Sequence, residues 1–136
     1  VCSSDLKSAM PNAATVGKMF HAFKGERGNF TVCVDGETWN SLTMVYGLEN
    51  PDVFGVAHKE PIDWRLDEKN HSPTGLEWGY GGSGPTQLAY CLLRECGLTQ
   101  PQASKLYVKF KQEVVASLPK EFYITRAEIM KWVQAQ

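Results

Sequence analysis

No stretch of this 136-residue chain is apolar over the length that a membrane-spanning helix needs. The chain also lacks a charged start followed by a long apolar segment, which is the pattern of a secretory signal. Neither sign of charge is in excess, because 14 Lys and Arg residues meet 15 Asp and Glu residues and leave a net charge of −1. These absences predict a soluble protein with no membrane partner.

The near-zero charge also argues against a general nucleic-acid binder, which carries a basic surface. One local patch stands against this argument, made by Lys105, Lys109 and Lys111 on a predicted helix. A solvated helix face is the simpler explanation of such a pattern. Nucleic acid is therefore a disfavoured partner.

Closely spaced cysteine pairs are missing too, because none of the four cysteines forms a CxxC motif. Cys91 and Cys96 lie five residues apart in a helical pattern, so their side chains diverge. With Cys33 in an apolar strand, all three are predicted to be free, buried thiols, which suits a reducing cytoplasm. His21 and His58 have no neighbours at metal-ligand spacing, so we expect neither a metal nor a cofactor.

The length allows one hydrophobic core, and 43% apolar with 21% charged residues is an ordinary globular composition. We therefore expect a single α+β domain over residues 16–136. Residues 1–15 are expected to be a disordered or non-native segment, because their start, VCSSDL, lacks an initiator Met and looks like translated adapter sequence.

The first half of the domain reads as an antiparallel β meander. Asp35-Gly36 is a strong hairpin signal, and the KGERGN stretch at 24–29 is expected to separate the first two strands. Prolines, charges and weak periodicity between 58 and 75 predict a long surface loop, and such loops are often functional. The β-prone segments are 20–23, 30–34, 37–39, 42–46 and 53–57.

The second half is predicted to hold three helices. The first has Pro85 at its first position and ends at Gly97, after which Leu98 can fold back on Leu93 in a Schellman motif. The second begins at a capping box of Thr99 and Gln102 and continues to Pro119. The third begins at a capping box of Thr125 and Glu128, after a short strand at 122–124, and continues to the C-terminus.

A glycine-rich turn, GYGGSG at residues 79–84, leads into the first helix. Its glycines permit positive φ and close backbone approach, and the helix start offers amide groups without internal partners. These groups and the helix dipole favour a phosphate or carboxylate, and Ser83 adds a hydroxyl. No Lys follows, as a P-loop requires, and no βαβ repeat surrounds the GxGxxG letters. A tight strand-to-helix crossing that binds nothing explains the glycines about equally well.

The stretch NHSPTGLEWGYGGSGP at residues 70–85, with QLA at 87–89, resembles the core of a domain-of-unknown-function family found in bacteria and their phages, DUF6166. The YxxFKxxVVxxLP pattern at 107–119 and the TxxEI start at 125 are similar to its C-terminal half. The resemblance runs from about residue 30 to the end, and segment 40–60 departs from it in being longer. It implies a location in the cytoplasm of a bacterial host cell and brings no established activity.

The motif and the turn together define a set of candidate ligand-binding residues. His71 and Glu77 have the side chains of an acid–base pair, and Ser72 could act as a nucleophile beside His71. However, neighbouring loop residues rarely face one another, and no third group that would orient them is evident. No catalytic residue is therefore assigned. The ligand-binding set is Asn70, His71, Ser72, Glu77, Trp78, Tyr80, Gly81, Gly82, Ser83, Gly84 and Gln87.

Two functions of different classes follow. The leading hypothesis is a non-enzymatic module that sequesters an anionic small molecule, such as a signalling nucleotide, with Trp78 or Tyr80 stacking on its base and backbone donors between Gly82 and Gln87. The alternative is a protein-interaction module that inhibits a host defence enzyme through exposed aromatics and segment 40–60. A hydrolase ranks third, and homo-oligomerisation stays open.

Overall fold

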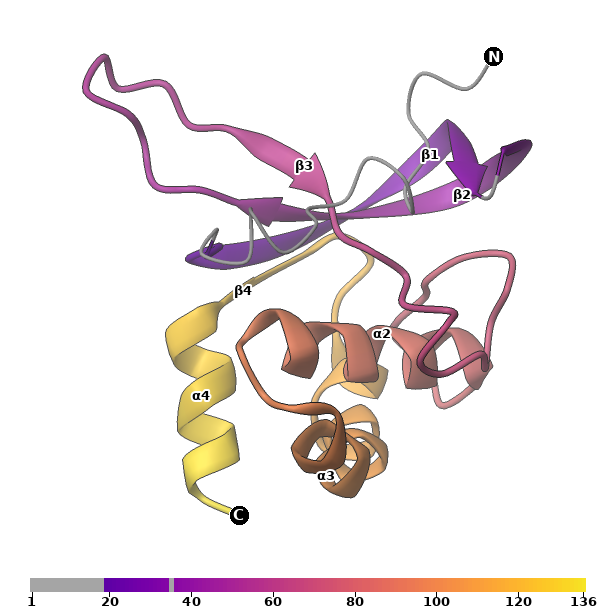
Figure 1. Cartoon of the computed structure of the whole chain (residues 1–136), viewed down its shortest axis with the longest axis vertical. Helices are drawn as coiled ribbons and strands as arrows, with labels where there is room; N and C mark the ends of the chain where they lie inside the picture. The colour runs from indigo at the N-terminus through magenta and orange to yellow at the C-terminus, as the bar shows by residue number, and fades with distance from the viewer. Residues whose placement is uncertain (1–18, 35) are drawn as a thin grey trace.

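The computed structural model describes residues 19–34 and 36–136, and the predicted domain start at residue 16 lies outside them. One antiparallel sheet, in the strand order β3-β2-β1-β4, forms a layer whose lower face in Figure 1 is covered by helices. The predicted α+β fold is confirmed. The strands are β1 (Ala22–Val34), β2 (Glu37–Leu48), β3 (Lys59–Pro61) and β4 (Phe122–Thr125). The helices are α2 (Ser83–Glu95), α3 (Gln100–Glu113), the 3₁₀ turn η2 (Val115–Ser117) and α4 (Arg126–Gln134).

β1 is one strand of 13 residues, and the predicted break at 24–29 is wrong. Gly25 is a packing glycine, because a Cβ there would lie 2.3 Å from the ring of Phe122. The pairing of β1 with β2 shifts in register between Arg27 and Phe30. This shift is a β-bulge, and it does not interrupt the strand. The pieces predicted at 37–39 and 42–46 likewise join into β2.

Residues 53–57, predicted as a strand, form the end of a protruding loop between β2 and β3 (Figure 1). The carboxylate of Asp52 accepts hydrogen bonds from the amides of Phe54 and Val56, at 2.8 and 3.0 Å, and Gly55 has a φ of 78°. This local turn prevents an extended conformation. The strand that pairs with β2 on this side is instead β3, which lies inside the stretch 58–75 that was predicted to be a loop.

The helix-end signals are confirmed. Leu98 donates its amide proton to the carbonyl of Leu93, and Gly97 to that of Arg94, which together make the Schellman motif. Both capping boxes are formed, at Thr99 for α3 and at Thr125 for α4. α3 ends at Glu113, earlier than expected, and η2 continues the chain towards Pro119.

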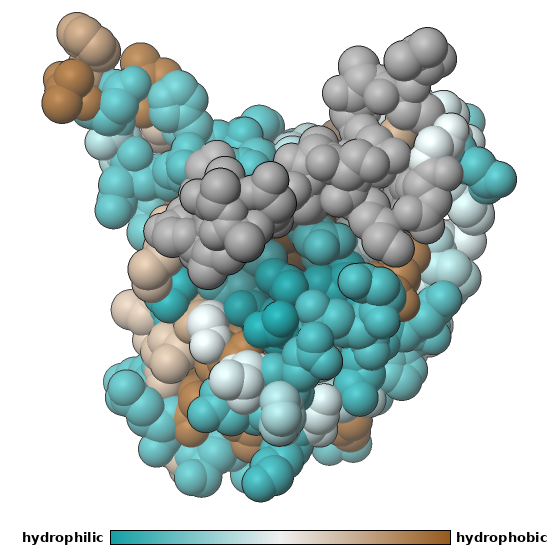
Figure 2. Space-filling model, viewed as in Figure 1, coloured by the Kyte–Doolittle hydropathy of each residue, from teal (hydrophilic) through white to brown (hydrophobic). Residues whose placement is uncertain are grey.

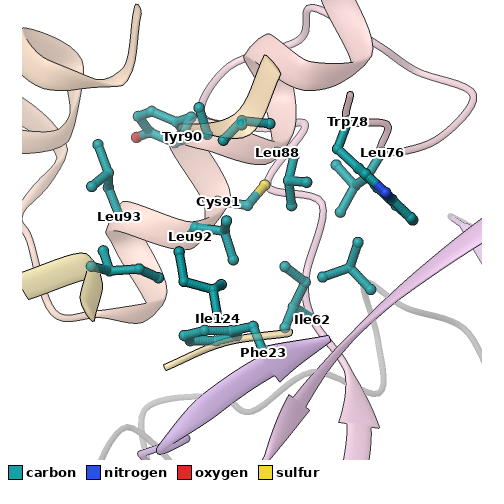
Figure 3. Close-up of a cluster of buried hydrophobic side chains, with 14 of the residues drawn as sticks. Phe23, Ile62, Leu76, Trp78, Leu88, Tyr90, Cys91, Leu92, Leu93 and Ile124 are labelled. Atoms are coloured by element: carbon teal, nitrogen blue, oxygen red, sulfur yellow. The ribbon is translucent and has the colours of Figure 1, made fainter. Parts of the chain in front are cut away.

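The core lies between the sheet and α2 (Figure 3). The loop after β3 contributes to the core, because Ile62 and Trp64 are buried. This part of the stretch 58–75 is therefore not the surface loop that was predicted. Cys91 and Cys96 are free and buried, and burial raises the pKa of both thiols. Cys33 is disulfide-bonded, so the prediction of a free thiol is wrong at that residue. Within the described residues, no helix has the length and apolarity to span a membrane.

Trp78 is the largest fully buried side chain, with 1% of its surface exposed. Its indole N–H donates to the carbonyls of Pro119 and Lys120, at 2.9 and 3.0 Å, and its ring meets Phe122 edge to face. Stacking on a ligand, as proposed from the sequence, needs an open ring face that Trp78 lacks.

We therefore expect Trp78→Ala to lower the free energy of unfolding by about 3–5 kcal/mol, through lost packing and a cavity. Tyr123→Ala is the control, because Tyr123 lies on β4 with 59% of its surface exposed. Chemical denaturation measures both. Equal midpoints for Trp78→Ala and the parent protein would contradict this packing.

Candidate functional site

A pocket of about 360 Å³ lies between β2 and the glycine-rich turn. Five of the predicted ligand-binding residues line it, namely Ser72, Glu77, Tyr80, Ser83 and Gly84. The wall formed by β2 was not predicted from the sequence. The other lining residues are Asn40, Ser41, Leu42, Thr43, Thr74, Gly75 and Leu76.

The start of α2 opens onto this pocket. The helix begins at Ser83 with Gly82 as its N-cap, two residues before the Pro85 start that was predicted, and no side chain caps it. Among the described residues, the amides of Ser83 and Gly84 have no hydrogen-bond acceptor, whereas the amide of Thr86 donates to the carbonyl of Gly82. The free donors are therefore fewer than the sequence suggested, but two of them belong to residues that line the pocket.

Glu77 lies beside these donors without capping them. Its carboxylate forms an ion pair with Arg27, at 2.8 and 3.1 Å, and Arg27 also donates to the carbonyls of Trp78 and Lys120. Gly84 permits the close approach, because a Cβ there would lie 2.6 Å from the Cβ of Glu77. The paired carboxylate adds little net charge to the pocket, and no Lys or Arg is among the lining residues.

Three hydroxyl groups in the pocket walls donate hydrogen bonds to backbone carbonyls of the protein itself. Ser41 donates to the carbonyl of Thr43 at 2.8 Å, Thr43 to that of Leu76 at 2.5 Å, and Ser72 to that of Gly75 at 2.6 Å. They fix the shape of the pocket. Within the described part of the chain, the polar side chains of the pocket without a hydrogen bond are Asn40, Thr74, Tyr80 and Ser83.

The remaining predicted site residues lie away from this pocket. Gln87 is fully buried and anchors the preceding loop: it donates to the carbonyls of Trp64 and Lys69 and accepts from the amide of His71. The ring of His71 contacts the hydroxyl of Tyr107 at 3.1 Å.

Neither the acid–base pair nor the nucleophile pair considered from the sequence is formed. His71 contacts Tyr107 and Glu77 contacts Arg27, while the Ser72 hydroxyl donates to the Gly75 carbonyl. Asn70 is exposed, and Gly81 and Gly82 belong to the turn without lining the pocket.

The glycines of the turn have different roles. Gly79 has a φ of 86° and donates its amide proton to Val115 at 3.0 Å. Gly82 has an extended φ of −134°, so the positive φ that a glycine permits is not used at this residue. A Cβ at Gly82 would instead lie 2.5 Å from the ring of Tyr80, and one at Gly81 would contact nothing within 4 Å.

The fold and this site define a small α+β domain with a polar pocket between a strand and an uncapped helix start. The chain belongs to a family of unknown function, DUF6166, whose model matches residues 48–135. The family inferred from the central motif is thus confirmed, although the match begins later than residue 30. Neither the comparison with curated proteins nor that with solved structures gave a match.

Substitution of the turn glycines by Ala tests these roles. Gly79→Ala is expected to lower the free energy of unfolding by about 1–3 kcal/mol, because a side chain strains a residue at positive φ. Gly81→Ala is the matched control, with an expected change within about 0.5 kcal/mol. Thermal and chemical denaturation measure both. If the two variants melt together, Gly79 is not the constrained position of the turn.

Proposed function

We propose that this protein is a non-enzymatic binding module whose pocket holds a small molecule with an anionic group, such as a nucleotide. The observation that carries the proposal is the coincidence of two features: a pocket of about 360 Å³, and a helix start whose first two amides are free within the described residues. The volume falls in the range of small-molecule sites, roughly 300–1,000 Å³. In the cytoplasm of a bacterium, such a module can sequester a signalling nucleotide, and a phage-encoded copy would thereby oppose host defence.

Neutral groups have to hold the anion, because the lining residues include no cation. The amides of Ser83 and Gly84, the positive end of the α2 dipole and the Ser83 hydroxyl are the donors. Tyr80 replaces Trp78 as the stacking candidate, since 52% of its surface is exposed and it lines the pocket. Stacking on a base contributes about 1–3 kcal/mol.

The first test separates the amide of Ser83 from its hydroxyl. Pro is favoured at the first helical position, and the extended Gly82 before it is compatible with Pro, so Ser83→Pro removes the N–H while the helix is kept. Ser83→Ala is the matched control that removes only the hydroxyl. A thermal-shift screen of nucleotides and cyclic dinucleotides identifies the ligand, and calorimetry measures its affinity.

We expect Ser83→Pro to weaken binding by about tenfold or more, as for a hydrogen bond to a charged group, and Ser83→Ala to weaken it less. Tyr80→Ala is expected to weaken binding of nucleotides with the fold unchanged. Unchanged affinity in Ser83→Pro would show that the anion does not contact the start of α2.

A second candidate function, protein interaction, is favoured by the loop between β2 and β3. Val53 and Phe54 are 93% and 86% exposed, and Val56 is half exposed. Figure 2 shows apolar surface at the outer end of this loop, at the upper left. The Asp52 carboxylate braces the turn through its amide hydrogen bonds, which lower its pKa, and through His58 at 3.3 Å. An ordered apolar tip is typical of a contact surface.

The tip is tested with a photoreactive residue at position 54. We expect capture of a partner that excess parent protein competes away and excess Phe54→Ser does not, because the partner would bind the missing ring. Phe54→Ser should melt like the parent, since it removes no buried contact. Capture that both competitors suppress equally would argue against the tip as the contact.

A further inference from the structure

One buried side chain of α2 fixes the loop backbone on both sides of Asn70. Gln87 is fully buried, and its side chain donates to the carbonyl of Lys69 at 2.8 Å and accepts from the amide of His71 at 2.9 Å. A buried amide with its hydrogen bonds satisfied holds its partners in one arrangement. Lys69 and His71 are therefore fixed, and both side chains contact Tyr107 of α3.

The ammonium group of Lys69 is held by two tyrosine rings. Its nitrogen lies 5.8 Å from the ring centroid of Tyr90 and 5.6 Å from that of Tyr107. Within the described chain it has no hydrogen-bond acceptor and no carboxylate partner. The adjacent Glu68 instead accepts from Arg94 with both oxygens, at 2.8 and 3.2 Å, and from the Tyr90 hydroxyl at 2.7 Å. The charge of Lys69 is thus positioned but not paired.

A comparable cluster on the sheet does contain a carboxylate. The nitrogens of Lys24 and Lys59 lie 6.0 and 4.3 Å from the ring centroid of Tyr46, and both pair with Glu26, at 2.6 and 3.6 Å. In that cluster the protein itself supplies the anion. Around Lys69, none of the residues that the structure describes does so, and an external anion would complete the same arrangement.

Further donors lie beside Tyr107. Its hydroxyl is 3.1 Å from Nε2 of His71, and the His71 ring is exposed. Residues three before and four after a given position are its neighbours on a helix, so Ser104 and Lys111 lie on the same side of α3 as Tyr107. Helical side chains lean towards the N-terminus, and the Lys111 side chain therefore covers the turn of Tyr107. Among the described residues, the side chains of Ser104 and Lys111 have no hydrogen bond or ion pair.

We propose that Lys69, His71 and Lys111 form a second binding site, which takes the phosphate group of a phosphomonoester. The two ammonium groups supply the charge, and the imidazole and the hydroxyls of Ser104 and Tyr107 supply further hydrogen bonds. Gln87 is a positioning residue that fixes Lys69 and His71. None of these residues lines the pocket between β2 and the glycine-rich turn, so the site is separate from that of the proposed function.

The charge of the cluster favours a phosphomonoester over other anions. Such a group carries about −1.5 to −2 charges at pH 7 and three acceptor oxygens, and Lys binds phosphate as a point charge. A carboxylate or a phosphodiester carries a single charge, which would leave one lysine unpaired. A nucleic-acid backbone also needs a row of cations, whereas Lys109 is already paired with Glu113 at 3.9 Å and the net charge of the chain is −1.

The experiment titrates the isotope-labelled full chain with O-phosphoserine and follows the backbone amides by NMR. We expect amide signals of residues 69–71 and 104–111 to shift, and those of Ser83 and Gly84 to stay in place. Shifts confined to Ser83 and Gly84 would place the phosphate in the pocket, which overturns this inference and supports the proposed function. Shifts at neither place overturn the inference as well.

Lys69→Met tests the fixed ammonium group, because it removes the charge and keeps an unbranched apolar chain against the two rings. We expect it to weaken O-phosphoserine binding by about tenfold or more in calorimetry, as for a hydrogen bond to a charged group. Lys105→Met is the matched control, since it removes the same charge from an exposed position of α3 and should keep the parent affinity. Equal affinities of the two variants overturn the site at Lys69.

Two further ligands test the chemical class and its source. Dimethyl phosphate represents a phosphodiester, and we expect it to bind about tenfold more weakly than O-phosphoserine. Equal or tighter binding overturns the choice of a monoester. Phosphoserine peptides with randomised flanking residues distinguish the sources of the monoester: binding tighter than that of O-phosphoserine supports a phosphorylated protein, and equal or weaker binding supports a small phosphorylated molecule.

Discussion

The contact on which the rest of the site depends is the one between Arg27 and the segment Glu77-Trp78. The guanidinium lies 4.5 Å from the ring centroid of Trp78, pairs with the carboxylate of Glu77 and donates to the carbonyls of Trp78 and Lys120. A charge that is partly removed from water needs such complete pairing. Arg27 lies just before the bulge of β1, so this one side chain ties the sheet to the glycine-rich turn and to the segment before β4.

This arrangement explains why the start of α2 is uncapped. A carboxylate near the first turn of a helix ordinarily accepts from its free amides. Here Glu77 packs against Gly84 but directs its carboxylate to Arg27, and Gly82 at the N-cap position has no side chain to take its place. Packing and charge pairing thus stabilise the turn without using the backbone amides of Ser83 and Gly84. These amides belong to residues that line the pocket. A Ser or Asp at position 82 would satisfy one of them internally.

Signals that act within a few residues were readable from the sequence. The capping boxes at Thr99 and Thr125 and the Schellman motif at Gly97 depend on neighbours along the chain, and all three are formed. Features set by distant partners were not readable. Gly25 looked like a loop residue because its contact, Phe122, lies almost a hundred positions away. The density of glycines in the turn suggested positive φ, but Gly82 is extended and lies against the ring of Tyr80.

The same distinction applies to the two walls of the pocket. The helix-start wall is local, since a turn rich in glycine before a helix is visible in any sequence. The β2 wall depends on a contact between distant segments, in which the Thr43 hydroxyl donates to the carbonyl of Leu76, and no pattern within residues 40–43 reveals it. The family match begins at residue 48 and therefore includes the first wall but not the second. The amides of Ser83 and Gly84 therefore lie in the part of the chain that the family model covers, whereas the β2 residues that line the pocket lie outside it.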